Sequence, residues 1–383
     1  MDTLKEMYNC QAIKDAGVIN YWGAEFEFPS CPAFNRGVRK CADRGMYCFT
    51  PQSSHYNERV CWWMKNVRNF DIKPEWILST LGTMYAIATL AMAWEKNGTG
   101  TLVMMTPDYA RYKQIADRMD MKSILIPMLI RDGRYYPDFD GIEQAFMQAK
   151  DDMIFVFSNP SNPTGRAYTA EELKRLDGLS RKYRVPVASD EIFSEVTPFG
   201  IRPVPYLEAA EDDSLAMAVT SLGKCMSLTG VNHSNVLIKN PDFREIYAKM
   251  RLVKHAGSVD PMLYHGLVEA YSEEGADFVR TLSEVIHDNI VKFQENLPKL
   301  IPGCKVFQPD AGYLLWVDYS GVGFSEDDML HFLNDEALFQ GDPGDDYFVS
   351  RYYYRYNMAV PCHEVDRTLE FIEKAAKKRG LIR

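Results

Sequence analysis

Lys224 follows an apolar run and is surrounded by small and apolar residues rather than by charged ones. Residues 216–238 have the sequence AMAVTSLGKCMSLTGVNHSNVLI, in which Ser221 precedes the lysine by three positions. Loss of water around a buried lysine lowers the pKa of its amine and makes it nucleophilic, as covalent bonding to a carbonyl compound requires. A lysine on a surface turn after a strand accounts for these residues equally well. Other parts of the chain must distinguish the two interpretations.

An asparagine-containing loop follows another apolar run. Residues 157–165 have the sequence FSNPSNPTG, and a Thr169-x-x-Glu172 capping box begins a helix shortly after them. Two Asn-Pro steps stiffen the loop and hold the amide of Asn162 at a fixed angle. A simple turn is the alternative, but the position between a strand and a helix favours a binding site.

Two more positions are suited to charged groups. Asp190 follows the apolar run 185–189, and a carboxylate at the end of a buried strand is costly unless a cation or hydrogen-bond donors meet it. Capping is the simpler explanation for this aspartate. A Gly82-Thr83 pair before a predicted helix at 84–96 offers N–H groups and a hydroxyl to an anion, although most such pairs are only caps.

Apolar runs alternate with helical patterns along the first two thirds of the chain. Continuous apolar strands separated by helices predict an α/β fold with a mostly parallel sheet covered on both faces. Ligands bind beyond the carboxyl ends of such strands. The seven predicted strands lie at residues 77–80, 101–105, 123–127, 153–157, 185–189, 216–219 and 235–238.

A long amphipathic helix from about Ala276 leads into a second unit. This unit is predicted to contain strands at 311–317 and 352–358 and a terminal helix. The N-terminal segment, with its aromatic residues at 20–29, is predicted to be an extended arm rather than a helix. The acidic stretch 342–346 is predicted to be a solvated loop.

Composition argues against several classes of protein. The 383 residues are 46% hydrophobic and 25% charged, as in an ordinary globular protein. A formal net charge of −10 argues against nucleic acid as the main partner. No apolar run approaches the roughly 20 residues of a membrane helix, and the N-terminus lacks a signal-peptide pattern, so a cytoplasmic location without membrane contact is predicted. The eight cysteines and seven histidines are dispersed, which predicts reduced thiols and gives no support for a metal site.

In their order along the chain, these segments resemble the pyridoxal-phosphate enzymes of the aspartate aminotransferase fold type. Within that group they are most similar to the cystathionine β-lyase-like carbon–sulfur lyases related to the maltose-regulon modulator. The resemblance covers nearly the whole chain and rests on WGAEFEFP at 22–29, SNPSNPTG, SDEI, the SxxK lysine followed by LTGVN, AGYLLW, and the RxNxAxP that begins at Arg355. Each motif alone is weak evidence for the family, but the whole set in this order is specific to it.

This resemblance implies a fold type I enzyme that binds pyridoxal 5′-phosphate. A large domain, with a mostly parallel seven-stranded sheet between helices, would span residues 46–280. A smaller α+β domain would combine residues 1–45 with residues 281–383. The resemblance also implies a homodimer with its sites between the subunits.

Residue by residue, the resemblance assigns a cofactor site. Lys224 would form a Schiff base with the cofactor aldehyde, and Asp190 would keep the pyridine nitrogen protonated so that the ring accepts electrons. Asn162 would donate to the 3-hydroxyl oxygen of the ring. Tyr109 would stack on the ring face and contact the substrate.

The resemblance also assigns the two ends of the site. Gly82, Thr83 and Ser221 would hold the cofactor phosphate. Arg355 would bind the substrate carboxylate with its planar bidentate fork. A surface salt bridge is the alternative for this arginine, and its aromatic surroundings at 352–356 disfavour it.

Besides Cys362, which replaces an arginine after the final proline, three positions depart from the family pattern. Phe193 stands where relatives usually carry a tyrosine or histidine, so one donor to the 3-hydroxyl oxygen is absent, and we predict a raised pKa for the Schiff base. Phe49 stands where relatives have the tyrosine that reaches the neighbouring subunit's phosphate, which leaves either Tyr47 as a substitute or a lower affinity for the cofactor. Gly223 replaces a common serine before the lysine.

The predicted function is a carbon–sulfur β-lyase that converts an L-cysteine conjugate such as cystathionine into a thiol, pyruvate and ammonia. The first alternative is an aminotransferase of an L-amino acid, which would use the same polar residues without a leaving group. The second is a regulatory protein of this fold that binds a transcription factor, although binding alone would not need a Schiff-base lysine. A lyase and an aminotransferase differ in whether the substrate Cβ carries a leaving group. The sequence does not specify that group.

Overall fold

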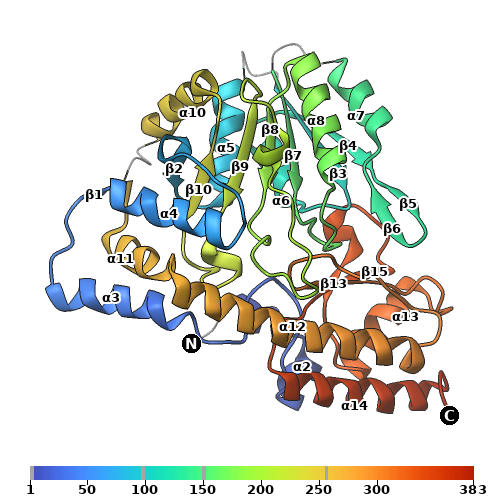
Figure 1. Ribbon diagram of the computed structural model, residues 1–383. Helices are drawn as coiled ribbons and strands as arrows, with labels where there is room; N and C mark the ends of the chain where they lie inside the picture. Colours follow the sequence, from blue (N-terminus) through green and yellow to red (C-terminus); the bar gives the residue numbers. More distant parts are fainter. Residues whose placement is uncertain (1–3, 96–99, 149–151, 255–257) are drawn as a thin grey trace.

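The computed structural model describes residues 4–95, 100–148, 152–254 and 258–383. A seven-stranded sheet lies in the upper half of Figure 1, with the strand order β2-β10-β9-β8-β7-β3-β4. Its strands are β2 (Ile77–Thr80), β3 (Thr101–Thr106), β4 (Lys122–Pro127), β7 (Met153–Ser158), β8 (Val187–Asp190), β9 (Ala216–Thr220) and β10 (Ser234–Leu237). β10 runs antiparallel to both of its neighbours, and the other adjacent pairs are parallel. The seven predicted strands and the mostly parallel sheet are confirmed.

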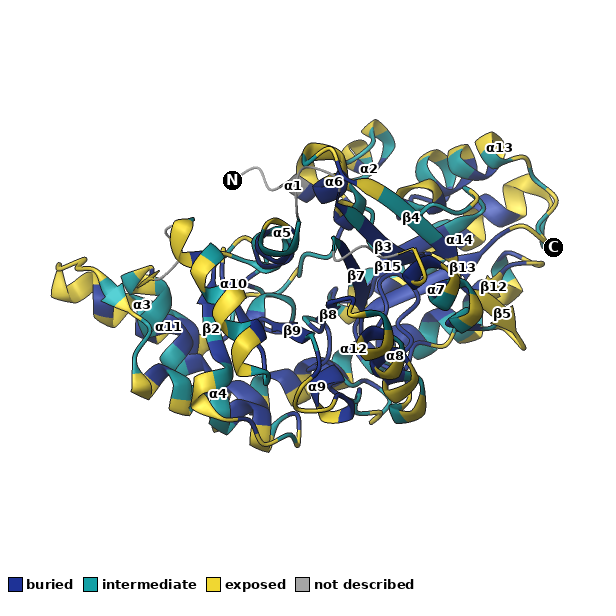
Figure 2. Cartoon of the chain, turned by 90° about the horizontal axis from the view of Figure 1, so that it is seen from above, coloured by how far each residue is buried: buried dark blue, intermediate teal, exposed yellow. Residues whose placement is uncertain are grey.

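Side chains alternate along β7 between two apolar clusters. Met153, Phe155 and Phe157 pack into one cluster, whereas Ile154 and Val156 pack into the other. Successive residues of a strand point to opposite faces, so a strand covered on both faces must be apolar throughout. Figure 2 shows these buried strands between helices whose outer faces are exposed.

The helices divide between the two clusters. The cluster containing Ile154 is covered by α5 (Thr83–Trp94), α6 (Arg111–Arg118) and α10 (Pro241–Val253). The cluster containing Phe155 includes residues of α4 (Ser54–Asn66), α7 (Phe139–Phe146), α8 (Ala170–Tyr183), α9 (Tyr206–Ala209), α11 (Pro261–Ala270) and α12 (Glu273–Leu300). Two short pairs complete this part, β1 (Thr50–Pro51) with β11 (Ser258–Val259) and β5 (Leu129–Arg131) with β6 (Arg134–Tyr136).

Helix starts follow the predicted caps. α8 begins with the predicted capping box, because Thr169 Oγ1 accepts from Glu172 N and the Glu172 carboxylate accepts from Thr169 N. α5 starts one residue before its predicted start, and its predicted end at Lys96 lies outside the described residues.

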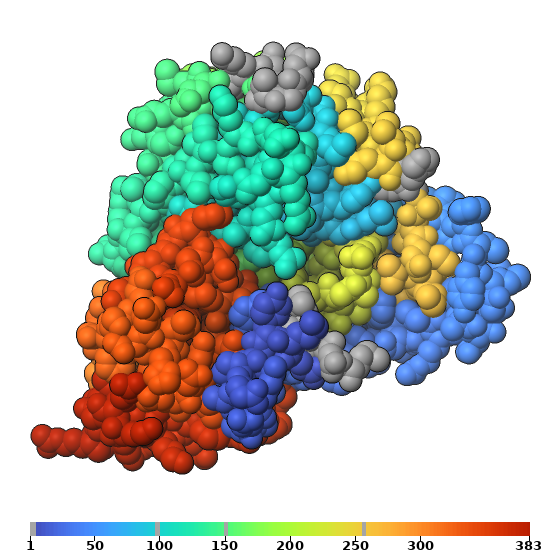
Figure 3. Space-filling model, turned by 180° about the vertical axis from the view of Figure 1, so that it is seen from behind, coloured from blue at the N-terminus to red at the C-terminus, as the bar shows by residue number. Residues whose placement is uncertain are grey.

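A four-stranded antiparallel sheet forms the centre of the second unit. Its order is β12-β13-β15-β14, with β12 (Lys305–Val306), β13 (Leu314–Asp318), β14 (Asp342–Pro343) and β15 (Tyr353–Asn357). The helices α1 (Leu4–Met7), α2 (Gln11–Ala16), α13 (Glu326–His331) and α14 (Cys362–Arg379) belong to this end of the molecule. Figure 3 shows the N-terminal segment in blue against the C-terminal residues in red, where Tyr21 N donates to Gln340 O at 2.9 Å and Asn357 N donates to Tyr21 O at 2.9 Å. The predicted strands and the terminal helix are confirmed.

The prediction that the N-terminal segment contains no helix is wrong for part of it. Residues 20–29 are non-helical as expected, but the short helices α1 and α2 precede them and α3 (Pro32–Arg44) follows them. α3 lies along α11 in Figure 1, and the two backbones approach so closely that a Cβ on Gly37 would lie 2.2 Å from His265 O. This helix is stabilised by a partner more than 200 residues away, which local sequence does not reveal.

The predicted solvated loop at 342–346 is also partly wrong. Asp345 and Asp346 are exposed, but Asp342 is buried on β14, where it pairs in register with Arg355. A two-residue strand carries too short a pattern to be recognised, and its burial depends on the neighbouring strand.

No helix among the described residues is both long enough and apolar enough to cross a membrane.

Candidate active site

The carboxyl ends of three parallel strands bring predicted residues to one edge of the large sheet. Asp190 ends β8 and pairs in register with Ser158 of β7 and Val219 of β9. Asn162 lies in the loop after β7, and Lys224 lies in the turn after β9. Because neighbouring parallel strands end at the same edge, these side chains gather there.

The Lys224 side chain extends to the N-terminal arm. Its Nζ donates to Ala24 O at 2.9 Å, and Tyr313 OH donates to the same carbonyl at 3.0 Å. Burial lowers the pKa of Lys224 to about 8, and the positive charge of Arg355 acts in the same direction. The lysine is therefore a far better nucleophile near neutral pH than an ordinary surface lysine.

Asp190 is held by a residue that the sequence analysis did not identify. Its Oδ2 accepts from Tyr112 OH at 2.6 Å, and its Oδ1 accepts from Ile192 N at 3.3 Å. Burial raises the pKa of Asp190 to about 6, while these donors and the charge of Lys224 oppose the rise. A buried carboxylate of this kind is well suited to a cationic N–H group, which would restore its ordinary acidity.

A second buried aspartate organises the loop that carries Asn162. Asp108 accepts from Ser158 Oγ at 2.6 Å and from Tyr109 N at 2.7 Å, and Ser158 Oγ accepts from Asn162 N at 2.8 Å. Burial raises the pKa of Asp108 to about 7. The only sequence feature that pointed to Asp108 was its position directly after an apolar strand, in Thr-Pro-Asp-Tyr.

Arg355 on β15 joins the two sheets across the site. Its Nη1 donates to Asn162 Oδ1 at 2.9 Å, and its Nε and Nη2 donate to Asp342 Oδ2 at 3.1 and 2.8 Å. Burial opposes the charge, but the Asp342 carboxylate raises the pKa of Arg355 overall. Asp342 Oδ2 also accepts from Gly23 N at 3.0 Å, which ties the N-terminal arm to this pair. A guanidinium has five N–H groups, so one remains on each terminal nitrogen of Arg355 for another acceptor.

The N-terminus of α5 forms the opposite end of the site. Gly82, its N-cap, has a φ of 99° and no atom lies within 4 Å of a Cβ placed there, so the backbone is open to a ligand. Thr83 Oγ1 lies 3.1 Å from Ser234 Oγ, and Ser221 Oγ donates to His233 O at 2.8 Å. β10 thus brings Thr83 and Ser221 together. The N–H groups of an uncapped helix start and nearby hydroxyls are donors that suit a phosphate.

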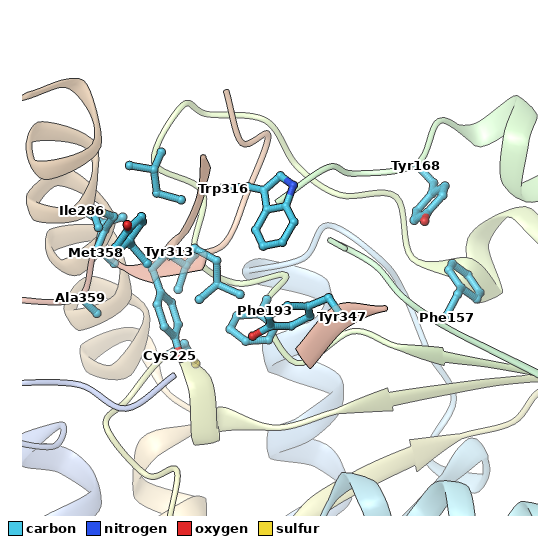
Figure 4. Close-up of a cluster of buried hydrophobic side chains, with 14 of the residues drawn as sticks. Phe157, Tyr168, Phe193, Cys225, Ile286, Tyr313, Trp316, Tyr347, Met358 and Ala359 are labelled. Carbon is cyan, nitrogen blue, oxygen red and sulfur yellow. The ribbon is translucent and has the colours of Figure 1, made fainter. Parts of the chain in front are cut away.

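Aromatic side chains form the walls of the site. The ring of Tyr109 packs edge-on against Tyr112, with centroids 5.5 Å apart. Phe193 is buried, its ring centroid lies 5.2 Å from that of Tyr313 and 5.9 Å from Lys224 Nζ, and Figure 4 shows it in a cluster of apolar side chains. The environment beside the lysine is therefore apolar on the Phe193 side.

The other two departures from the family pattern have different surroundings. A Cβ on Gly223 would lie 3.2 Å from Ser221 Oγ, so a serine there would crowd that hydroxyl. Phe49 is fully exposed, and Tyr47 is 58% exposed. Neither the Phe49 ring nor the Tyr47 ring therefore packs into the candidate active site of the same chain.

This sequence and fold match proteins of known family. The sequence model described as aminotransferase class I and II matches residues 33–350. Cystathionine beta-lyase PatB of Bacillus subtilis (strain 168) is 24% identical over 327 residues, which cover 85% of this chain and 84% of PatB. The aspartate aminotransferase of Pyrococcus horikoshii is 22% identical over 379 residues, which cover 97% of this chain and 94% of that protein.

A solved structure shares the fold over almost the full length. The crystal structure of cystalysin from Treponema denticola, which contains a pyridoxal 5′-phosphate cofactor, superposes with a TM-score of 0.90. The two sequences are 24% identical, and the match covers 98% of this chain and 96% of cystalysin.

Proposed function

Because the chain belongs to the aminotransferase class I and II family, we propose that it is a pyridoxal-phosphate-dependent carbon–sulfur β-lyase. Its substrate would be an L-cysteine conjugate such as cystathionine, which it would convert into a thiol, pyruvate and ammonia. The observation that carries the proposal is the grouping of Lys224, whose pKa is lowered to about 8, with Asp190 and the hydrogen-bonded pair of Asn162 and Arg355. The activity named for PatB supports a lyase in particular.

The residues present fit this cofactor. A phosphate suits the N–H groups at Gly82 and Thr83 and the Thr83 hydroxyl, and Ser221 would add its hydroxyl by turning it away from His233 O. A protonated pyridine nitrogen suits the buried carboxylate of Asp190. An aldehyde suits the amine of Lys224. When bound, pyridoxal phosphate supplies an electron sink for the negative charge that develops on the substrate Cα.

The chain's own residues orient the reactants and move the proton. Asn162 uses its Oδ1 for Arg355, so its Nδ2 is the donor for the oxygen on the cofactor ring. Tyr109 would stack on the face of the cofactor ring. The two remaining N–H groups of Arg355 bind the substrate carboxylate. The substrate amine would displace Lys224 from the cofactor aldehyde, so that the freed Nζ takes the proton from the substrate Cα and the thiolate leaves from Cβ. Water would then release the rest of the substrate as pyruvate and ammonia.

Uptake of pyridoxal phosphate by the cofactor-free protein is expected to accelerate as the pH rises through about 8. The neutral amine is the nucleophile, and burial lowers the pKa of Lys224 to about 8. About a quarter of the Lys224 amine would be neutral at pH 7.5, compared with about 0.1% of an ordinary lysine. Stopped-flow absorbance across pH 6–10 measures this rate. A midpoint near the ordinary lysine pKa would contradict the assignment.

Replacing Phe193 by tyrosine is expected to lower the pKa at which the visible absorbance of the holoenzyme titrates. The phenylalanine offers no donor to the oxygen on the cofactor ring, and a tyrosine hydroxyl would stabilise the negative charge of that oxygen. The free energy of a hydrogen bond to a charged group is large enough to lower the pKa by about 1. Phe193→Leu, which adds no hydroxyl, is the matched control and should not lower it. The same pKa in the tyrosine variant and the wild type would count against this explanation.

Incubating the purified holoenzyme with cystathionine or cystine, without any keto acid, tests the lyase function. Sustained release of pyruvate and a thiol, well beyond one equivalent per site, is the expected result. Accumulation of the pyridoxamine form without pyruvate would overturn the proposal. That outcome would favour an aminotransferase, which the full-length match to the Pyrococcus aspartate aminotransferase keeps as the second candidate.

We further propose a homodimer. The segment between α3 and β1 exposes three large apolar side chains: Met46, Tyr47 and Phe49 are 52%, 58% and 101% exposed. Large apolar side chains grouped on one exposed segment are typical of a surface that a partner covers. Sedimentation of the wild type and of a Tyr47→Ser/Phe49→Ser variant tests this, with a shift toward monomer expected for the variant.

We also propose how the chain divides into domains and where the protein is located. The two separate sheets support a large domain at 46–280 and a smaller one formed by 1–45 with 281–383. A cytoplasmic location is proposed from the sequence features described above. A role limited to binding a transcription factor is not favoured, because it would not need Lys224 beside Asp190 and Arg355.

A further inference from the structure

Arg111 lies between two residues of the candidate active site in the sequence. Tyr109 is assigned to the face of the cofactor ring, and Tyr112 OH donates to Asp190 Oδ2 at 2.6 Å. These residues stand at the start of α6, which follows β3 and so begins at the edge of the sheet where β7, β8 and β9 end. The Cζ atom of Arg111 lies 5.9 Å from the centroid of the Tyr109 ring. The start of α6 therefore carries a guanidinium to the edge of the site.

The charge of Arg111 acts on the reacting amine. Burial lowers the pKa of Lys224, and the charges of Arg355 and Arg111 both act in the same direction. Burial also raises the pKa of Tyr109, and the charge of Arg111 opposes that rise. Arg111 is therefore close enough to Lys224 and Tyr109 to attract a negatively charged group bound beside them.

The position of Arg111 is not explained by the stability of α6. A positive charge in the first turn of a helix is unfavourable, because the helix dipole is positive at that end. The other cation of this turn, Lys113, pairs with Asp117 at 2.6 Å. The Arg111 side chain is exposed, and within the described ranges of the chain it makes no ion pair and no hydrogen bond. Its N–H groups are therefore available to an anion that enters the site.

The other charged side chains around the site do not occupy Arg111 or take over its role. Arg355 pairs with Asp342 at 2.8 Å, and its two remaining N–H groups are assigned to the α-carboxylate of the substrate. Lys5 is buried and lies 2.8 Å from Glu27 Oε1. The remaining acids near the site lie beyond ion-pair distance of Arg111: Glu25, Asp108, Asp190 and Asp346. A second carboxylate on the substrate therefore needs Arg111.

We propose that Arg111 binds a carboxylate at the far end of the substrate, so that the preferred L-cysteine conjugates carry an anionic group on the sulfur substituent. This inference rests on the proposed lyase function and narrows its substrate class. Cystathionine and cystine, which end in a second carboxylate, belong to the class, whereas simple S-alkyl conjugates do not. A bound substrate would cover part of the guanidinium and exclude water, which strengthens its attraction for the carboxylate.

Two conjugates that differ only in charge at the far end test this inference. S-(2-carboxyethyl)-L-cysteine carries the second carboxylate, and S-(2-carbamoylethyl)-L-cysteine carries an amide of the same size. With wild-type holoenzyme, kcat/KM for pyruvate release is expected to favour the carboxylate by about tenfold or more, as for loss of a hydrogen bond between charged groups. The concentration that half-saturates the change in visible absorbance is expected to show the same preference. Equal values for the two conjugates would overturn the inference.

Variants of α6 test whether Arg111 is the source of the preference. Arg111→Met keeps the length of the side chain but removes its charge, and is expected to abolish most of the preference. Arg111→Lys should restore part of it. Arg118→Met is the matched control, because Arg118 is also exposed but stands in the last turn of the same helix, and it should keep the wild-type preference. An Arg111→Met variant that weakens both conjugates equally would show that the arginine supports the fold or the cofactor, and would overturn the inference.

The two measurements distinguish this inference from the lyase proposal. Pyruvate release from both conjugates with equal efficiency would overturn the role of Arg111 and leave the lyase proposal intact. A preference for the carboxylate in the absorbance titration, without pyruvate release, would support the role of Arg111 and overturn the lyase proposal. No absorbance response to either conjugate would overturn both.

Discussion

Replacing Lys224 by alanine is expected to reduce the rate of pyruvate release from cystathionine by about 10³-fold or more. The variant loses both the amine that bonds to the cofactor aldehyde and the base that takes the Cα proton, and a positioned base alone contributes about 10²–10⁴-fold. Pyruvate formation at saturating substrate measures the effect. The visible absorbance band that borohydride removes from the wild type is expected to be missing from the variant. Retention of more than a tenth of the wild-type rate would contradict the assignment.

The loss should be chemical rather than structural. Within the part of the chain that the structure describes, Lys224 Nζ makes one hydrogen bond, to Ala24 O, and burial already disfavours its charge. Removing it is therefore not expected to lower the thermal midpoint by more than a few degrees. Lys224→Arg is the matched control, because it keeps a long cationic side chain but cannot act as the nucleophile at neutral pH.

Replacing Arg355 by glutamine is expected to raise KM strongly and to destabilise the protein. The substrate carboxylate loses its two remaining donors, so kcat/KM should fall by about 10²-fold or more. Asp342 is left buried without its cation, and breaking a buried ion pair in this way typically removes about 3–5 kcal/mol of stability. Steady-state kinetics and urea denaturation measure the two effects separately.

The double variant Asp342→Asn/Arg355→Gln separates these two roles of the arginine. It removes both charges together, so much of the lost stability should return because no unpaired charge stays buried. Catalytic efficiency should stay low, since the donors for the substrate are still missing. A double variant with wild-type kcat/KM would show that Arg355 does not bind the substrate. A double variant as unstable as Arg355→Gln would show that the pair with Asp342 is not the reason for the destabilisation.

The sequence by itself determined the large sheet and the positions of its functional side chains along the chain. The central strands β3, β7, β8 and β9 are buried almost throughout because both faces are covered, so each appears as an apolar run that can be recognised locally. Parallel strands end at one edge, and Asp190 and Lys224 could therefore be placed near one another, because Asp190 ends β8 and Lys224 follows β9. The order of the motifs along the chain indicated the family, and the family model that matches residues 33–350 agrees with that assignment.

Only the tertiary structure decided which groups meet those side chains. Tyr112 holds Asp190, Asp108 holds the loop of Asn162, and Asp342 holds Arg355. Each partner comes from another element, and local sequence does not encode a hydrogen bond between side chains that folding brings together. The burial of Asp342 depends on a two-residue strand, and α3 depends on its packing against α11. Long-range contacts set these features, whereas the sheet follows from hydrophobic patterns within single segments.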